Sequence, residues 1–141
     1  MEKKDRYIFA AIFSHEPDGI AVEFPDLPGC LTCGKDELEA LRMAEEALAG
    51  HILTIEEQGW PVPEPTPVRK IRAGEGQSVV LVAADMPLVR EAARNRAVKK
   101  TLTIPQWLDE LAREKDVNFS LVLQEALKER LRVSSGRKRT K

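Results

Sequence analysis

Three polar residues alternate with apolar ones where the last third of the chain begins. Lys99, Thr101 and Thr103 occupy every second position, with Leu102 and Ile104 on the alternate positions. In an extended strand, successive side chains point to opposite faces, so the three polar residues share one face. A two-stranded ribbon fits the major groove of DNA, where lysine reaches guanine acceptors and threonine contacts base edges or the thymine methyl group. We therefore expect these three residues to contact bases; the alternative is a solvated edge strand.

Two further polar residues, Asn118 and Ser120, stand where a later helix is expected to begin. Asparagine is a favourable N-cap, and the free N–H groups at a helix N-terminus can hold a phosphate. We expect both residues to belong to the DNA-binding surface, and helix capping alone is the alternative.

The chain contains two cysteines, Cys30 and Cys33, in a C-x-x-C arrangement that could form a redox dithiol or half of a zinc site. A zinc site needs two more ligands, and the two histidines, His15 and His51, have no paired spacing. The segment around the cysteines also looks extended, which points the two sulfurs to opposite faces. We expect two unrelated cysteines, no metal site and no cofactor.

Three carboxylates, Asp18, Glu23 and Asp26, cluster in the sequence near the first predicted strands. A metal-dependent nuclease needs several acids that converge on metal ions. These three are predicted to lie on a turn, a strand and a loop, so a partner-facing surface is favoured over a catalytic one. They are our candidates for contact with a protein partner, and we expect no catalytic residues.

The charges divide the chain into two parts of opposite sign. Residues 1–86 contain 8 Lys/Arg and 16 Asp/Glu, whereas residues 87–141 contain 14 and 7, within a net charge of −1. A basic segment favours a polyanion such as nucleic acid, and an acidic one favours a basic partner. We therefore expect the chain to contact nucleic acid through its C-terminal part and a basic molecule through its N-terminal part.

The elements that position these residues fall into two predicted domains. Residues 1–86 predict a βββαβ domain, with strands near 7–13, 20–24, 30–33 and 78–84, the last of them buried. The first strand is apolar on both faces, as in a central strand, and the turn signal at 17–19 predicts a hairpin with the second. Asp36 and Glu39 form a capping box for the helix, which Gly59 ends. Its apolar stripe is expected to face the sheet and comprises Leu38, Leu41, Ala44, Leu48, Ile52 and Ile55.

The second part is too small to form a core by itself. We expect residues 87–97 to be a linker, 98–133 a strand followed by two helices, and 134–141 a basic disordered tail. A domain of this size cannot bury its own apolar stripe, and an unpaired strand leaves its backbone groups unsatisfied. Pairing of two copies solves both problems, so a homodimer or a higher oligomer is expected.

Two parts of the chain resemble known families. The C-terminal segments NRAVKKTLTIPQWLDELA (95–112) and VNFSLVLQEAL (117–127) resemble the ribbon–helix–helix DNA-binding fold. The segments FPDLPGCLTCG (24–34), EALRMAEEAL (39–48) and PEPTP (63–67) resemble the HicB antitoxin family. The resemblance implies an α+β protein, in which a truncated RNase H-like domain binds the basic, RNA-cleaving HicA toxin. It also implies that the C-terminal domain binds the operator and represses the toxin–antitoxin operon.

The function expected from these observations is that of an antitoxin and autorepressor, not an enzyme. Its partners would be a HicA-type toxin, operator DNA and a second copy of the chain. No run approaches the roughly 20 apolar residues of a membrane span, and the first residues lack a signal-peptide pattern, so a cytoplasmic protein without membrane contact is expected. Two alternatives are a stand-alone ribbon–helix–helix regulator, whose head domain senses a ligand or oligomerises, and a minimal nuclease.

Overall fold

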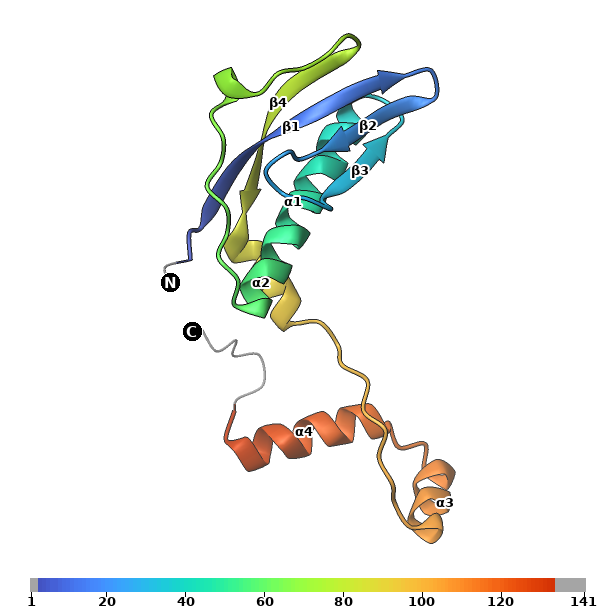
Figure 1. Ribbon diagram of the computed structural model, residues 1–141. Helices are drawn as coiled ribbons and strands as arrows, with labels where there is room; N and C mark the ends of the chain where they lie inside the picture. Colours follow the sequence, from blue (N-terminus) through green and yellow to red (C-terminus); the bar gives the residue numbers. More distant parts are fainter. Residues whose placement is uncertain (1–2, 134–141) are drawn as a thin grey trace. The chain divides into compact units, whose positions relative to one another are not determined.

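A computed structural model of the chain describes residues 3–133 (Figure 1). These residues divide into two compact units; the first ends at Ala97 and the second begins at Val98. The first unit contains β1 (Arg6–Glu16), β2 (Gly19–Glu23), β3 (Leu31–Gly34), α1 (Glu37–Gln58), the short 3-10 helix η1 (Val68–Lys70), β4 (Gln77–Asp85) and α2 (Met86–Arg94). The second contains α3 (Gln106–Glu114) and α4 (Phe119–Leu131). The predicted mixture of α and β structure is confirmed.

The sheet of the first unit is wholly antiparallel, with the order β3-β2-β1-β4. β1 is therefore a central strand, as its aromatic and β-branched residues predict. Its register places Phe13 opposite Val22 of β2 and Phe9 opposite Val82 of β4. The predicted hairpin around residues 17–19 is confirmed, because Glu16 pairs with Gly19 across the turn.

The core lies between this sheet and α1, which covers one face (Figure 1). Strand alternation sends Phe9 and Phe13 to the helix side, where Leu48 and Ile52 of α1 are fully buried. The loop between β2 and β3 adds Leu27 and Cys30, among other residues, to the same cluster. A single helix on a single sheet face thus supplies the apolar burial that stabilises the unit.

The predicted capping of α1 is confirmed. The carboxylate of Asp36 accepts the backbone N–H of Glu39 at 2.8 Å, and the carboxylate of Glu39 accepts the backbone N–H of Lys35 at 3.2 Å. The return contact thus reaches the residue before the cap instead of the cap residue itself. Gly59 ends the helix with φ 74°, a left-handed conformation that glycine adopts without a steric penalty.

Two of the leucines that we expected to face the sheet do not. Leu38 is 69% exposed and Leu41 is 36% exposed, whereas Ala40 and Ala44 are fully buried. The close approach of α1 to the end of β3, where a Cβ on Gly34 would overlap the backbone of Ala40, holds Ala40 at the centre of the contact. Leu38 and Leu41 lie on the flank beside it, and no element of the first unit covers that flank along the first half of α1.

The expectation that β4 is a buried strand is also wrong in part. β4 is an edge strand, so its other long side has no neighbouring strand in the sheet. Val82 and Ala84 are buried against α1, but Leu81 points to the other face and is 59% exposed. A continuous apolar run suggests burial on both faces, and α1 covers only one face of this sheet.

Helix α2 occupies most of the segment that we expected to serve as a linker, and it contacts α1. Met86 is fully buried, and Val89 packs against the core. Arg90 donates from Nε and Nη2 to the two carboxylate oxygens of Glu56, at 3.0 and 2.7 Å, and from Nη2 to the carbonyl of Lys4 at 2.7 Å. The hydrogen bond to Glu56 raises the pKa of Arg90.

The two cysteines lie in different environments, as the extended segment predicts. Cys30 is buried, and its thiol donates to the carbonyl of Ala47 at 3.5 Å. Burial raises the pKa of this thiol to about 11, so it stays protonated near neutral pH. Cys33 is exposed, and both thiols are free.

The second unit contains the helices α3 and α4, and no residue between Val98 and Val133 is buried. Asn118 caps α4 as predicted, because its side chain accepts the backbone N–H of Leu121 at 3.0 Å. The strand expected at residues 99–104 is not formed in the single chain. A ribbon strand forms only when a second strand satisfies its backbone groups, and one chain supplies one such segment.

The expected tail, 134–141, lies outside the described residues. Across the part that is described, no helix combines the length and the apolar character that a membrane span requires.

The contact between Arg90 and Glu56 predicts a measurable stability effect. The side chain of Glu56 is only 5% exposed, so Arg90→Met leaves a carboxylate nearly buried and unpaired. We expect the free energy of unfolding to fall by about 2–4 kcal/mol in urea titrations. The control is Arg6→Met, because the Arg6–Asp85 pair is largely exposed and should contribute less than about 1 kcal/mol. Equal effects of the two changes would contradict the assignment.

Candidate functional site

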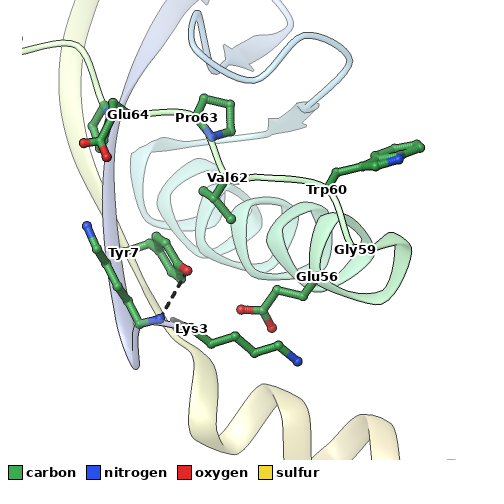
Figure 2. A pocket seen from close by; sticks show the side chains of 10 residues that line it. Lys3, Tyr7, Glu56, Gly59, Trp60, Val62, Pro63 and Glu64 are labelled. Atoms are coloured by element: carbon green, nitrogen blue, oxygen red, sulfur yellow. Dashed lines mark hydrogen bonds between the residues drawn. The ribbon is translucent and has the colours of Figure 1, made fainter. Parts of the chain in front are cut away.

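The first unit has a pocket of about 260 Å³ between the N-terminal end of β1, the last turn of α1 and the proline-rich segment that follows it (Figure 2). Its lining includes Tyr7, Glu56, Trp60 and Val62. The prolines of residues 61–67 favour an extended chain, so this segment forms one wall.

Two of the polar side chains that line this pocket, Tyr7 and Glu56, are already engaged. The Tyr7 hydroxyl accepts the backbone N–H of Lys4 at 3.3 Å, and Arg90 holds both carboxylate oxygens of Glu56. The indole of Trp60 is directed away from the pocket in Figure 2 and is 60% exposed. The volume is also slightly below the range of typical ligand sites, about 300–1,000 Å³. Nothing in this geometry favours the ligand-sensing alternative.

The structure does not bring the three candidate carboxylates together. Asp26 accepts the backbone N–H of Thr66 at 2.8 Å and its hydroxyl at 2.6 Å, so it anchors the proline-rich segment. Glu23 is exposed on the sheet face opposite α1, since its neighbours Val22 and Phe24 are buried on the helix side.

Asp18 is exposed in the turn between β1 and β2, beside a second pocket of about 250 Å³ that Glu16, Lys35 and Glu39 also line. Within the described residues, no three His, Cys, Asp or Glu side chains are arranged to hold a metal ion. The geometry therefore offers no convergent metal site of the kind a nuclease requires.

The candidate DNA-binding residues are exposed. Lys99, Thr101 and Thr103 alternate along a segment without regular structure, and their side chains are accessible to solvent. At the start of α4, Asn118 is occupied as the N-cap, and the hydroxyl of Ser120 accepts a hydrogen bond from Gln124 Nε2 at 3.1 Å. This end of α4 is exposed. A phosphate could therefore reach the helix N-terminus, where N–H groups point outward.

Sequence reasoning missed two features of the first unit. The pairing of Arg90 with Glu56 joins residues 34 positions apart, and no local pattern connects them. The exposure of Leu38 and Leu41 was missed as well, although the absent side chain at Gly34 was a signal for close helix–strand contact.

Comparison with known proteins places this geometry in a family. Residues 8–127 match the family described as HicB-like antitoxin of bacterial toxin–antitoxin systems. An uncharacterized 14.9 kDa protein from the rep–hol intergenic region of Haemophilus phage HP1 is 30% identical over 92 residues, which span 64% of this chain and 68% of the phage protein.

Solved structures show the same fold. A toxin–antitoxin complex from Streptococcus pneumoniae contains a chain with a TM-score of 0.58 and 24% identity, covering 89% of this chain and 99% of that one. The Burkholderia pseudomallei antitoxin HicB gives a TM-score of 0.51 and 23% identity, covering 89% and 98%. Since the family match spans most of the sequence, the chain belongs to the HicB-like antitoxin family of bacterial toxin–antitoxin systems.

Proposed function

We propose that this chain binds and neutralises a small, basic, RNA-cleaving toxin of the HicA type by covering its RNA-binding or catalytic surface. The observation that carries the proposal is family membership combined with the net charge of −8 over residues 1–86. An acidic surface attracts a basic partner and guides its approach. The similar fold in a streptococcal toxin–antitoxin complex supports the same partner class.

The second unit is proposed to be a ribbon–helix–helix domain that represses the operon. It exposes large apolar side chains, among them Leu102 before α3 and Trp107, Leu121, Val122 and Leu127 on the two helices. Soluble proteins rarely expose so many apolar side chains to solvent, so we propose that a second copy of the chain buries them in a dimer. Pairing of residues 99–104 from two copies would then present Lys99, Thr101 and Thr103 to the major groove.

Three finer assignments accompany this proposal. The first unit is proposed to be a truncated RNase H-like domain, on the support of its βββαβ element order. It is proposed to have no nuclease activity, because Asp18, Glu23 and Asp26 lie apart and Asp26 is committed to Thr66. The protein is proposed to act in the cytoplasm, where the mRNA substrate of such a toxin and the operator are both present.

The toxin-binding role is tested by co-expression with a HicA-type toxin encoded beside this gene. The full chain should restore growth, and a fragment of residues 1–97 should do so as well, because α2 and its contacts complete the first unit. The fragment should not bind DNA, since it lacks residues 98–133. A folded fragment that fails to protect cellular RNA would show that the second unit is also needed for neutralisation.

The DNA-binding role is tested at Lys99. If Lys99 contacts a base, Lys99→Ala should weaken binding to the promoter DNA of the operon by about 1–3 kcal/mol in a sequence-dependent way. If it contacts a phosphate, the loss should be uniform and the salt dependence should flatten by about one unit. Fluorescence anisotropy on specific and random duplexes separates these outcomes, with Lys70→Ala in η1 as the control. Unchanged affinity for both duplexes would remove the ribbon from the interface.

The pairing of two copies is tested at Leu123, which is half-buried on α4. Leu123→Asp would place an unpaired charge in the shared core, at a cost of several kcal/mol. Operator binding should be lost, because the ribbon exists only when two strands pair, while toxin binding by the first unit should survive. The control is Leu123→Met, which keeps an apolar side chain of similar size at the same position. A Leu123→Asp variant that binds the operator as tightly as the wild type would refute the shared core.

A further inference from the structure

Two leucines are left bare on the first half of α1. Leu38 is 69% exposed and Leu41 is 36% exposed, and their spacing of three residues makes them neighbours on the helix surface. Glu45, four residues after Leu41, is exposed and continues the same flank. We call Leu38, Leu41 and Glu45 the α1 flank patch.

The rest of this flank is covered. Further along the helix, Ala49 and Ile52 are buried, and Glu56 is held by Arg90 of α2. Helix α2 thus lies against the second half of α1, and the structure of the first unit supplies no equivalent cover for the first half. The apolar stripe that the sequence directs into the core therefore emerges on the surface at Leu38 and Leu41.

We propose that the α1 flank patch is the surface on which the basic toxin docks, an inference that rests on the proposed function. The partner it fits is a protein surface with apolar side chains bordered by lysine or arginine. Charge supports this occupant: over residues 37–46 of α1, Glu37, Glu45 and Glu46 are exposed, against one cation, Arg42. Interfaces commonly combine a small apolar centre with a charged rim of complementary sign.

The other occupants fit less well. A second copy of the chain would bring two patches of net negative charge together, and like charges across an interface are unfavourable. The opposite face of the sheet also exposes apolar groups, including Ile8, Leu31 and Leu81. That face also carries Glu23, but its Asp85 is paired with Arg6 at 3.7 Å, so fewer carboxylates remain unpaired there to attract a basic partner.

The test measures the affinity of the purified full chain for a catalytically inactive HicA-type toxin by calorimetry. Leu38→Lys should weaken binding at least about tenfold, because a central apolar contact is replaced by a charge that repels a basic surface. The matched control is Leu31→Lys, since Leu31 is 66% exposed on the opposite face and should change affinity less than about twofold.

A second pair of variants tests the charge contribution. Glu45→Lys should slow association and weaken its dependence on salt, whereas Glu57→Lys, exposed on a different flank of α1, should do so less. Circular dichroism and thermal unfolding of each variant show whether the first unit, which carries all four substitutions, is still folded. Hydrogen exchange of the wild-type chain adds a measurement without mutation: the amides of residues 37–46 should gain protection when the toxin binds.

The results separate this inference from the proposed function. Failure of the wild-type chain to bind the toxin would overturn both. Tight wild-type binding with no loss in Leu38→Lys, or with a larger loss in Leu31→Lys, would overturn the α1 flank patch alone. Equal effects of Glu45→Lys and Glu57→Lys, without added protection at residues 37–46, would also overturn it.

Discussion

The contact between Gly34 and Ala40 sets the geometry of the first unit. Because Gly34 has no side chain, the end of β3 and the first turn of α1 meet backbone to backbone. This contact fixes the rotation of α1, so that Ala40, Ala44, Leu48 and Ile52 point at the sheet. The placement of the core follows from that rotation, whereas Leu38 and Leu41 are exposed because no element of the first unit covers the first half of that flank. Any side chain at position 34 would push the helix away from the sheet.

Much of the first unit could be predicted from the sequence because its signals are local. Alternation in residues 20–24, the turn at 17–19 and the capping by Asp36 each act over a few residues, and each is present in the structure. The central position of β1 also followed from its apolar character on both faces.

What the sequence did not predict depends on contacts between distant residues. The exposure of Leu38 and Leu41 depends on which part of α1 the other elements cover, and the attachment of α2 depends on Glu56 and Arg90. The edge position of β4 depends on which face of the sheet is covered. Among the candidate site residues, Asp26 is predicted from its charge alone. Its hydrogen bonds to Thr66 join residues 40 positions apart, so no local sequence pattern indicates them. The strand expected at residues 99–104 is not formed in the single chain, because a strand needs a second strand to satisfy its backbone groups.

The attachment of α2 to the first unit has a consequence for the reach of the molecule. With α2 ending at Arg94 and α3 beginning at Gln106, 11 residues connect the last helix of one unit to the first of the other. Fully extended, such a tether spans at most about 40 Å. A toxin held by the first unit would therefore stay within a short radius of any DNA held by the second. At that distance the effective concentration of one bound partner near the other is set by the tether and not by the cell.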